Sequence, residues 1–89
     1  MEYIITFKNT NFAIKAEQCL LEQKLRASVL PLPSQISAGC GICLRTNQDE
    51  IKPALKVLAD KNIDEIGLFM REMINGQFSY TEVNHLAEH

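Results

Sequence analysis

The 89-residue sequence has little of what most specialised classes of protein require. It contains only four glycines and three prolines, and its 46% hydrophobic and 22% charged residues are ordinary for one soluble globular domain. No apolar run approaches the ~20 residues of a membrane-spanning helix, and the first residues lack the pattern of a secretion signal. We therefore expect one domain, no membrane contact and a cytoplasmic location.

Excess positive charge is absent too. Nine Lys and Arg residues stand against eleven Asp and Glu, a net charge of −2, which is the wrong sign for a domain that binds phosphate backbones. An odd number of cysteines, three, argues for reduced thiols and against a disulfide framework. The glycine-rich, His-Glu and serine motifs of nucleotide sites, zinc proteases and hydrolases are also missing. We expect no nucleic-acid partner, no cofactor and no metal.

Hydrophobic periodicity predicts five strands and two helices. The strands are expected at residues 3–8, 27–30, 42–46, 65–74 and 77–83, and the first helix at 12–25. The second helix should begin within a few residues upstream of Pro53, where Asn47 and Glu50 have the spacing of a capping box. Asn75-Gly76 predicts a tight hairpin turn between the last two strands.

A weak internal repeat suggests how these elements combine. A shift of 37 positions aligns Phe7-Lys8 with Leu44-Arg45 and Ile14-Lys15 with Ile51-Lys52. Two β-α-β halves in tandem give an α+β, ferredoxin-like sandwich, in which one antiparallel sheet carries both helices on one face. We predict this domain over residues 1–74 and a C-terminal strand extension over residues 75–89.

Side chains alternate between the two faces of a strand, so the predicted sheet sorts its residues. Those expected to face the helices are Tyr3, Ile5, Phe7, Ile42 and Leu44. Those expected on the open face, part of which the C-terminal hairpin could cover, are Thr6, Lys8, Cys43 and Arg45.

The segment 31–41 is the most unusual part of the chain, and such loops often carry function. Gly39 and Gly41 flank Cys40, which should leave the thiol exposed and allow backbone N–H groups to turn toward the sulfur. An ordinary cysteine is only a few per cent thiolate near neutral pH, so a reactive one needs such help. Alternatively the glycines shape a tight turn and Cys40 is a small filler; the residue pattern does not decide between these.

Cys40 and Cys43 form a C-x-x-C pair, which has two further interpretations. A redox dithiol normally opens a helix, whereas this pair opens a strand, where residues three apart face opposite sides. A zinc site would need two more ligands, for which only His85 and His89 have a suitable spacing. Both interpretations are weaker than a single reactive cysteine, and Cys19 lies on the apolar stripe of the first helix, as a core residue does.

The motif P-x-P-x-x-I-S-x-x-C-G over residues 31–41 is followed by a strand that ends in Leu44-Arg45. Together with the strand at residues 3–8 and the helix residues Ala13–Glu17, it resembles the family called putative selenium/sulfur carrier protein-like, over residues 3 to about 72. The resemblance implies a small bacterial domain in which Cys40 holds sulfur or selenium as a persulfide or selenosulfide. The supporting loop would comprise Ser37, Gly39, Gly41, Cys43 and Arg45. Cys43 stands where the resemblance leads us to expect a small residue such as Ala.

Two function hypotheses follow. In the first, the chain is a carrier without turnover of its own: Cys40 accepts sulfur or selenium from a donor such as a cysteine desulfurase and passes it to an acceptor protein. Arg45, Lys8 or Arg26 could supply positive charge near the thiol. In the second, the chain is a non-catalytic, ferredoxin-like binding module with a structural Cys40. The C-terminal extension could form the edge of a homodimer.

Overall fold

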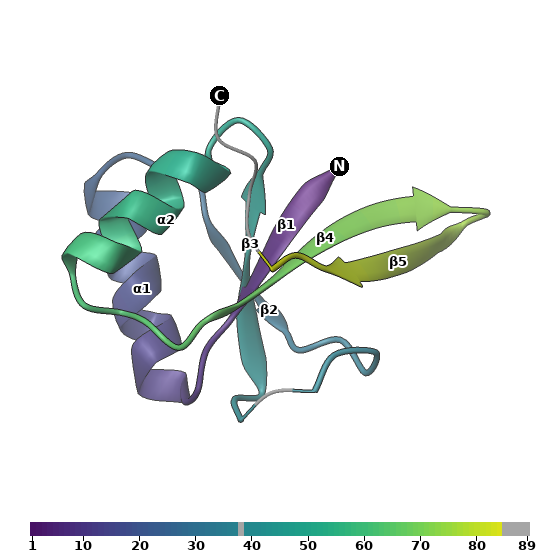
Figure 1. The fold of residues 1–89 in the computed structure, drawn as a ribbon, viewed down its shortest axis with the longest axis horizontal. Coiled ribbons are helices and arrows are strands. Elements are labelled where there is room, and N and C mark those ends of the chain that lie inside the picture. The colour runs from purple at the N-terminus through teal and green to yellow at the C-terminus, as the bar shows by residue number, and fades with distance from the viewer. Residues whose placement is uncertain (38, 85–89) are drawn as a thin grey trace.

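The computed structural model describes residues 1–37 and 39–84 and contains two helices and one five-stranded sheet (Figure 1). In chain order the elements are β1 (Glu2–Thr6), α1 (Thr10–Glu22), β2 (Ser28–Pro31), β3 (Ile42–Asn47), α2 (Ile51–Asp60), β4 (Gly67–Ile74) and β5 (Gln77–Glu82). The spatial order of the strands is β2-β3-β1-β4-β5, and every neighbouring pair is antiparallel.

The predicted α+β, ferredoxin-like fold is confirmed. β1 lies between β3 and β4, so the first strand of each β-α-β half is at the centre of the sheet, and both helices pack on the same face (Figure 1). β5 adds an outer strand beyond β4, and the β4–β5 hairpin projects away from the helices. None of the described helices is long and apolar enough to cross a membrane.

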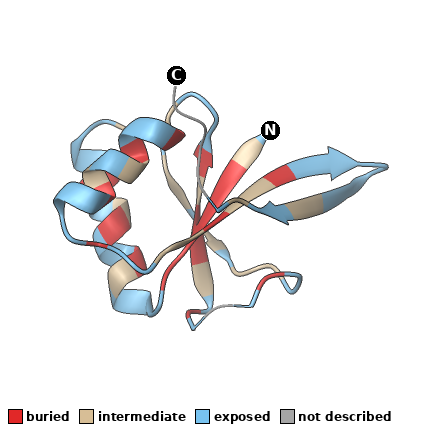
Figure 2. Ribbon diagram, in the orientation of Figure 1, coloured by how far each residue is buried: buried red, intermediate tan, exposed pale blue. Residues whose placement is uncertain are grey.

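The main core lies between the helices and the sheet (Figure 2). As predicted, Tyr3, Ile5, Phe7 and Leu44 are buried there, and Ile42 packs against them. The helices contribute the apolar stripes that their periodicity predicts; the buried residues are Ala13, Ala16, Cys19 and Leu20 of α1 and Ile51, Ala54 and Leu58 of α2.

The other face of the sheet is less open than predicted. Cys43 and Ile4 are fully buried there beneath Ile36 of the β2–β3 loop, with Tyr80 of β5 packed against the same cluster. The hairpin therefore covers part of this face, as expected, and the β2–β3 loop covers it as well. The reason is that the loop supplies apolar side chains of its own, which a sheet face can bury.

Only one of the two helices has a side-chain cap at its start. Asn9 caps α1, since its Oδ1 accepts the Phe12 N–H at 2.9 Å. The capping box expected at the start of α2 does not form: the Glu50 carboxylate accepts the backbone N–H of Arg26 instead, at 3.1 Å. Pro53 lies in the first turn of α2, where a missing N–H costs no hydrogen bond.

Two elements are shorter than the hydrophobic pattern predicts, and in each case a residue with a positive φ angle lies just outside the element. Lys24, at φ 62°, lies beyond the end of α1, which therefore stops short of the predicted Leu25. Glu65, at φ 56°, delays β4 to Gly67. Asn75 and Gly76 both have positive φ, as the predicted primed turn requires, and the boundary that we predict after residue 74 falls at this turn. The homodimer through the extension stays a prediction.

Two adjacent leucines of α1 test the placement of the core. Leu20→Ala is expected to lower the free energy of unfolding by about 2–5 kcal/mol, because a fully buried leucine leaves a cavity. Leu21 is 51% exposed on the same helix, so Leu21→Ala should change this free energy by less than about 0.5 kcal/mol. Urea denaturation of both variants measures the difference, and equal losses would contradict the described face of α1.

Candidate functional site

Cys40 lies at the end of the β2–β3 loop, directly before β3. The loop is closed at its base by a hydrogen bond from the Leu32 N–H to the Gly41 carbonyl, at 2.9 Å, and turns where the Ile36 N–H meets the Pro33 carbonyl at 3.0 Å. It therefore returns to the sheet with a fixed base, although it has few regular hydrogen bonds. This base places residue 40 at the amino end of β3.

The expectation that the Cys40 thiol is exposed is wrong, because the residue is only 4% exposed. Its side chain packs in the main core, on the helix side of the sheet. Cys40 lies in the bend before β3, where its sulfur accepts the Ile42 N–H and its side chain packs on the same side of the sheet as Leu44. Flanking glycines do not reverse this orientation.

The burial is nevertheless shallow. Gly39, Gly41 and Thr10 are all exposed, and Thr10 Oγ1 lies 3.7 Å from the Cys40 sulfur. The thiol is therefore one layer beneath the surface, at the rim of the core rather than at its centre.

Within the described residues, two polar groups contact this sulfur. The Ile42 N–H donates to Cys40 Sγ at 3.4 Å, and the Thr10 hydroxyl either donates to it or accepts from it. The prediction that a backbone N–H turns toward the sulfur is therefore met by Ile42. Thr10, the first residue of α1, was not predicted, although the antiparallel pairing of β1 with β3 brings residues after Thr6 beside those before Cys43.

The two glycines beside Cys40 have different environments. A Cβ on Gly39 would lie 2.6 Å from the backbone oxygen of Lys8, which no real structure tolerates without a shift. A Cβ on Gly41 would have no neighbour within 4 Å. Gly39 is thus needed for the close approach of the loop to the end of β1, whereas nothing in the described fold requires a glycine at position 41.

Cys43 is on the opposite face of the sheet from Cys40, as expected for residues three apart at the start of a strand. It is fully buried, and its thiol donates to the Pro31 carbonyl at 3.8 Å. Burial raises the pKa of this thiol, the positive charge of Arg71 opposes the rise, and nearby Cys40 adds to it. Both cysteines are free thiols, and Cys43 is bonded to an acceptor that favours its neutral form.

The predicted charged neighbours are not gathered at Cys40. Arg45 lies on the face opposite Cys40, where its Nε is 3.6 Å from the Glu2 carboxylate and its Nη2 donates to Ser28 Oγ. Lys8 packs over the Phe12 ring and pairs with Glu65 at the surface. The Arg45 side chain instead makes its contacts on the sheet face, and the Lys8 side chain makes its contacts near the start of α1.

The remaining predicted residues add little polar structure at the thiol. Ser37 is exposed in the β2–β3 loop. No group of three or more His, Cys, Asp or Glu residues that could hold a metal occurs within residues 1–37 and 39–84. His85 and His89, which the zinc interpretation needs, lie outside the described residues.

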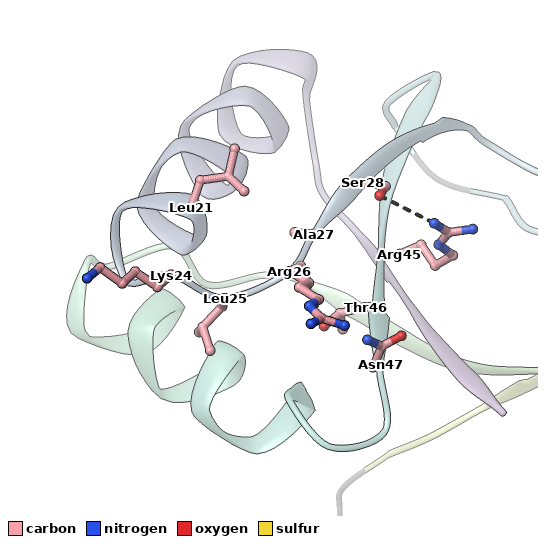
Figure 3. A pocket seen from close by; sticks show the side chains of 9 residues that line it. All are labelled: Leu21, Lys24, Leu25, Arg26, Ala27, Ser28, Arg45, Thr46 and Asn47. Carbon is pink, nitrogen blue, oxygen red and sulfur yellow. Dashed lines mark hydrogen bonds between the residues drawn. The ribbon is translucent and has the colours of Figure 1, made fainter.

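A hollow of about 600 Å³ lies at the other end of the β2–β3 ladder from Cys40 (Figure 3). Figure 3 shows Arg26, Thr46 and Asn47 close together in it, while Lys24 points away. The Thr46 hydroxyl donates to the backbone oxygen of Arg26 at 3.1 Å. Arg26 therefore belongs to this hollow. The residues that line it do not include Cys40 or the two groups that contact its sulfur.

Comparison with known proteins yields one family. The family model described as "Putative Se/S carrier protein-like" matches residues 2–69, which includes both helices, the β2–β3 loop and the start of β4. No curated protein matches the chain. A crystal structure of a functionally unknown protein from Pediococcus pentosaceus ATCC 25745 is similar at 11% identity and a TM-score of 0.44, over 99% of this chain and 93% of that one.

The glycines offer a matched pair of substitutions. Gly39→Ala is expected to lower the free energy of unfolding by about 1–3 kcal/mol, because its methyl group meets backbone rather than a movable side chain. Gly41→Ala should stay within about 0.5 kcal/mol of the wild type, since it adds the same methyl group in open space. Thermal and urea unfolding of both variants measure the effect. A neutral Gly39→Ala would show that the loop does not pack on Lys8.

The raised pKa of Cys43 predicts a pH dependence. Above the ordinary thiol pKa of 9.0 the unfolded chain loses this proton while the folded chain keeps it, so the free energy of unfolding falls as the pH rises toward the folded value. Cys43→Ala lacks this contribution. Between pH 8 and pH 10, on the order of one pH unit either side of that value, the wild type should therefore lose more stability than the variant. Equal slopes in urea titrations would contradict the raised pKa.

Proposed function

Because the chain belongs to the "Putative Se/S carrier protein-like" family, we propose that it carries sulfur or selenium on Cys40. The observation that supports this choice is the environment of the sulfur. Cys40 Sγ receives a backbone N–H and contacts a hydroxyl, both of which can donate to an anionic sulfur. Cys43 faces a carbonyl, which can only accept, and Cys19 is a core residue of α1. Cys40 therefore differs from Cys43 in that its sulfur receives a backbone N–H.

The transfer step needs no cofactor. The Cys40 thiolate attacks the terminal sulfur of a persulfide on the donor, a new S–S bond forms on Cys40, and the donor's S–S bond breaks. The donor cysteine leaves as a thiolate and the transferred sulfur keeps its proton, so charge and oxidation level balance. A cysteine desulfurase is a donor of the required class. In the second transfer, an acceptor's thiolate attacks the terminal sulfur on Cys40 in the same manner, and Cys40 leaves as a thiolate.

Burial sets a condition on this step, because a cysteine residue that is only 4% exposed cannot meet a donor in the resting fold. Transfer requires the backbone at Gly39 and Gly41 to move away from the end of β1, so that a donor reaches the sulfur while the sulfur keeps its contact with Thr10. The exposed neighbours and the free space beside Gly41 make such a movement local, since it does not separate the helices from the sheet. After the loop closes, the persulfide would be shielded from water and from other thiols.

Mass spectrometry tests the proposal. After incubation with a cysteine desulfurase and cysteine, and in parallel with inorganic polysulfide, Cys40 should gain about 32 Da, the mass of one sulfur atom. Cys40→Ser should gain nothing, and a Cys19→Ser/Cys43→Ala variant, whose only cysteine is Cys40, should still gain it. Peptide mapping that finds the added mass on Cys19 or Cys43, or finds none with either donor, would refute the carrier function.

The burial of Cys40 favours one alternative, a non-catalytic binding module in which Cys40 is structural. The two functions differ in the reactivity of the thiol. For a carrier, iodoacetamide should alkylate Cys40 in the folded protein faster than Cys19 and Cys43, because opening the loop alone exposes it. For a module, Cys40 should react no faster than the other two, since all three then wait for global unfolding.

A further inference from the structure

Of the two polar contacts of the Cys40 sulfur, the one with Ile42 comes from the backbone and the one with Thr10 comes from a side chain. A substitution can therefore remove the contact with Thr10. Thr10 Oγ1 lies 3.7 Å from Cys40 Sγ although the two residues are thirty positions apart in the chain. Thr10 is the first residue of α1, and the capping of that helix is done by its neighbour Asn9. The Thr10 hydroxyl is therefore not committed to the helix cap.

The two contacts of the sulfur differ in what they can do. The Ile42 N–H can only donate, so it bonds to the sulfur whether the thiol is neutral or charged. A hydroxyl both donates and accepts, and its hydrogen rotates to suit its partner. Thr10 can accept the S–H hydrogen of the neutral thiol and can turn to donate to the sulfur when that hydrogen is lost. It is the one contact that adapts to the change of charge.

We infer that Thr10 is a positioning residue for sulfur chemistry at Cys40: its hydroxyl holds the neutral thiol at rest and stabilises the anionic sulfur during transfer. This inference rests on the proposed function, because it takes the Cys40 sulfur as the reacting atom. The position of Thr10 at the amino end of a 13-residue helix adds to the effect, since the free N–H groups of that end favour negative charge nearby.

A purely structural role of Thr10 predicts the opposite effect of its removal. Were the hydroxyl only a latch that keeps Cys40 covered, its loss would open the loop more often and Cys40 would react faster. Loss of a donor to the anionic sulfur slows the reaction instead. The sign of the change in rate therefore separates the two roles.

The experiment compares Thr10→Val, which keeps the shape of the side chain, with Thr10→Ser, which keeps the hydroxyl. The rate of Cys40 alkylation by iodoacetamide at neutral pH should fall about tenfold in Thr10→Val, as expected for one hydrogen bond to a charged group, and recover to within about twofold in Thr10→Ser. In urea all three proteins should react equally, because the contact is lost on unfolding. The Cys19→Ser/Cys43→Ala background makes Cys40 the only reacting thiol.

An unchanged or faster rate in Thr10→Val, or no recovery in Thr10→Ser, would overturn the inference. Iodoacetamide needs no sulfur donor, so this outcome is distinct from failure of the proposed function. Thr10-dependent alkylation without any persulfide on Cys40 would refute the carrier and leave the role of Thr10 standing. Persulfide on Cys40 with no effect of Thr10→Val would do the reverse.

Discussion

The turn of the chain into β3 is the constraint on which the candidate site depends. Leu44 and Ile42 face the helices, and Cys40, in the bend just before them, packs on the same side with its sulfur accepting the Ile42 N–H. Cys40 is therefore drawn to the rim of the core, where it meets Thr10, while Cys43 is turned to the other face beneath Ile36. The two thiols therefore lie on opposite faces of the sheet and have different hydrogen-bond partners.

The fold follows from the sequence because its determinants are local or periodic. Alternating apolar residues define the strands, the stripes of α1 and α2 define the helix faces, and Asn75-Gly76 defines the hairpin turn. The errors occur where a long-range contact overrides a local preference. Glu50 caps the backbone of Arg26 rather than its own helix, an interaction between residues 24 positions apart that no capping motif contains.

The sequence singles out Cys40 as the candidate residue, but the exposure expected for its thiol is wrong. The flanking glycines single out Cys40, yet glycine next to a residue says nothing about which side of the chain that residue faces. Gly39 is explained by the Lys8 carbonyl and not by access to the thiol. The sequence pattern does not predict the contact of Thr10 with Cys40, because it joins the start of a helix to the end of a loop. These two places are brought together by the pairing of β1 with β3.

In the proposed carrier, the buried thiol has to be exposed before it can react. Local openings that cost a few kcal/mol leave the open form populated at about 0.1–10%, which is ample for transfer during a bound encounter but reduces chance reactions in proportion. The covering loop is anchored by Ile36 in the cluster on the far side of the sheet, whereas Cys40 itself anchors to the near side. In the proposed carrier, a partner that displaces the exposed Gly39 and Gly41 would uncover the sulfur without separating the helices from the sheet, so the donor or acceptor, rather than thermal unfolding of the domain, would decide when the sulfur is presented.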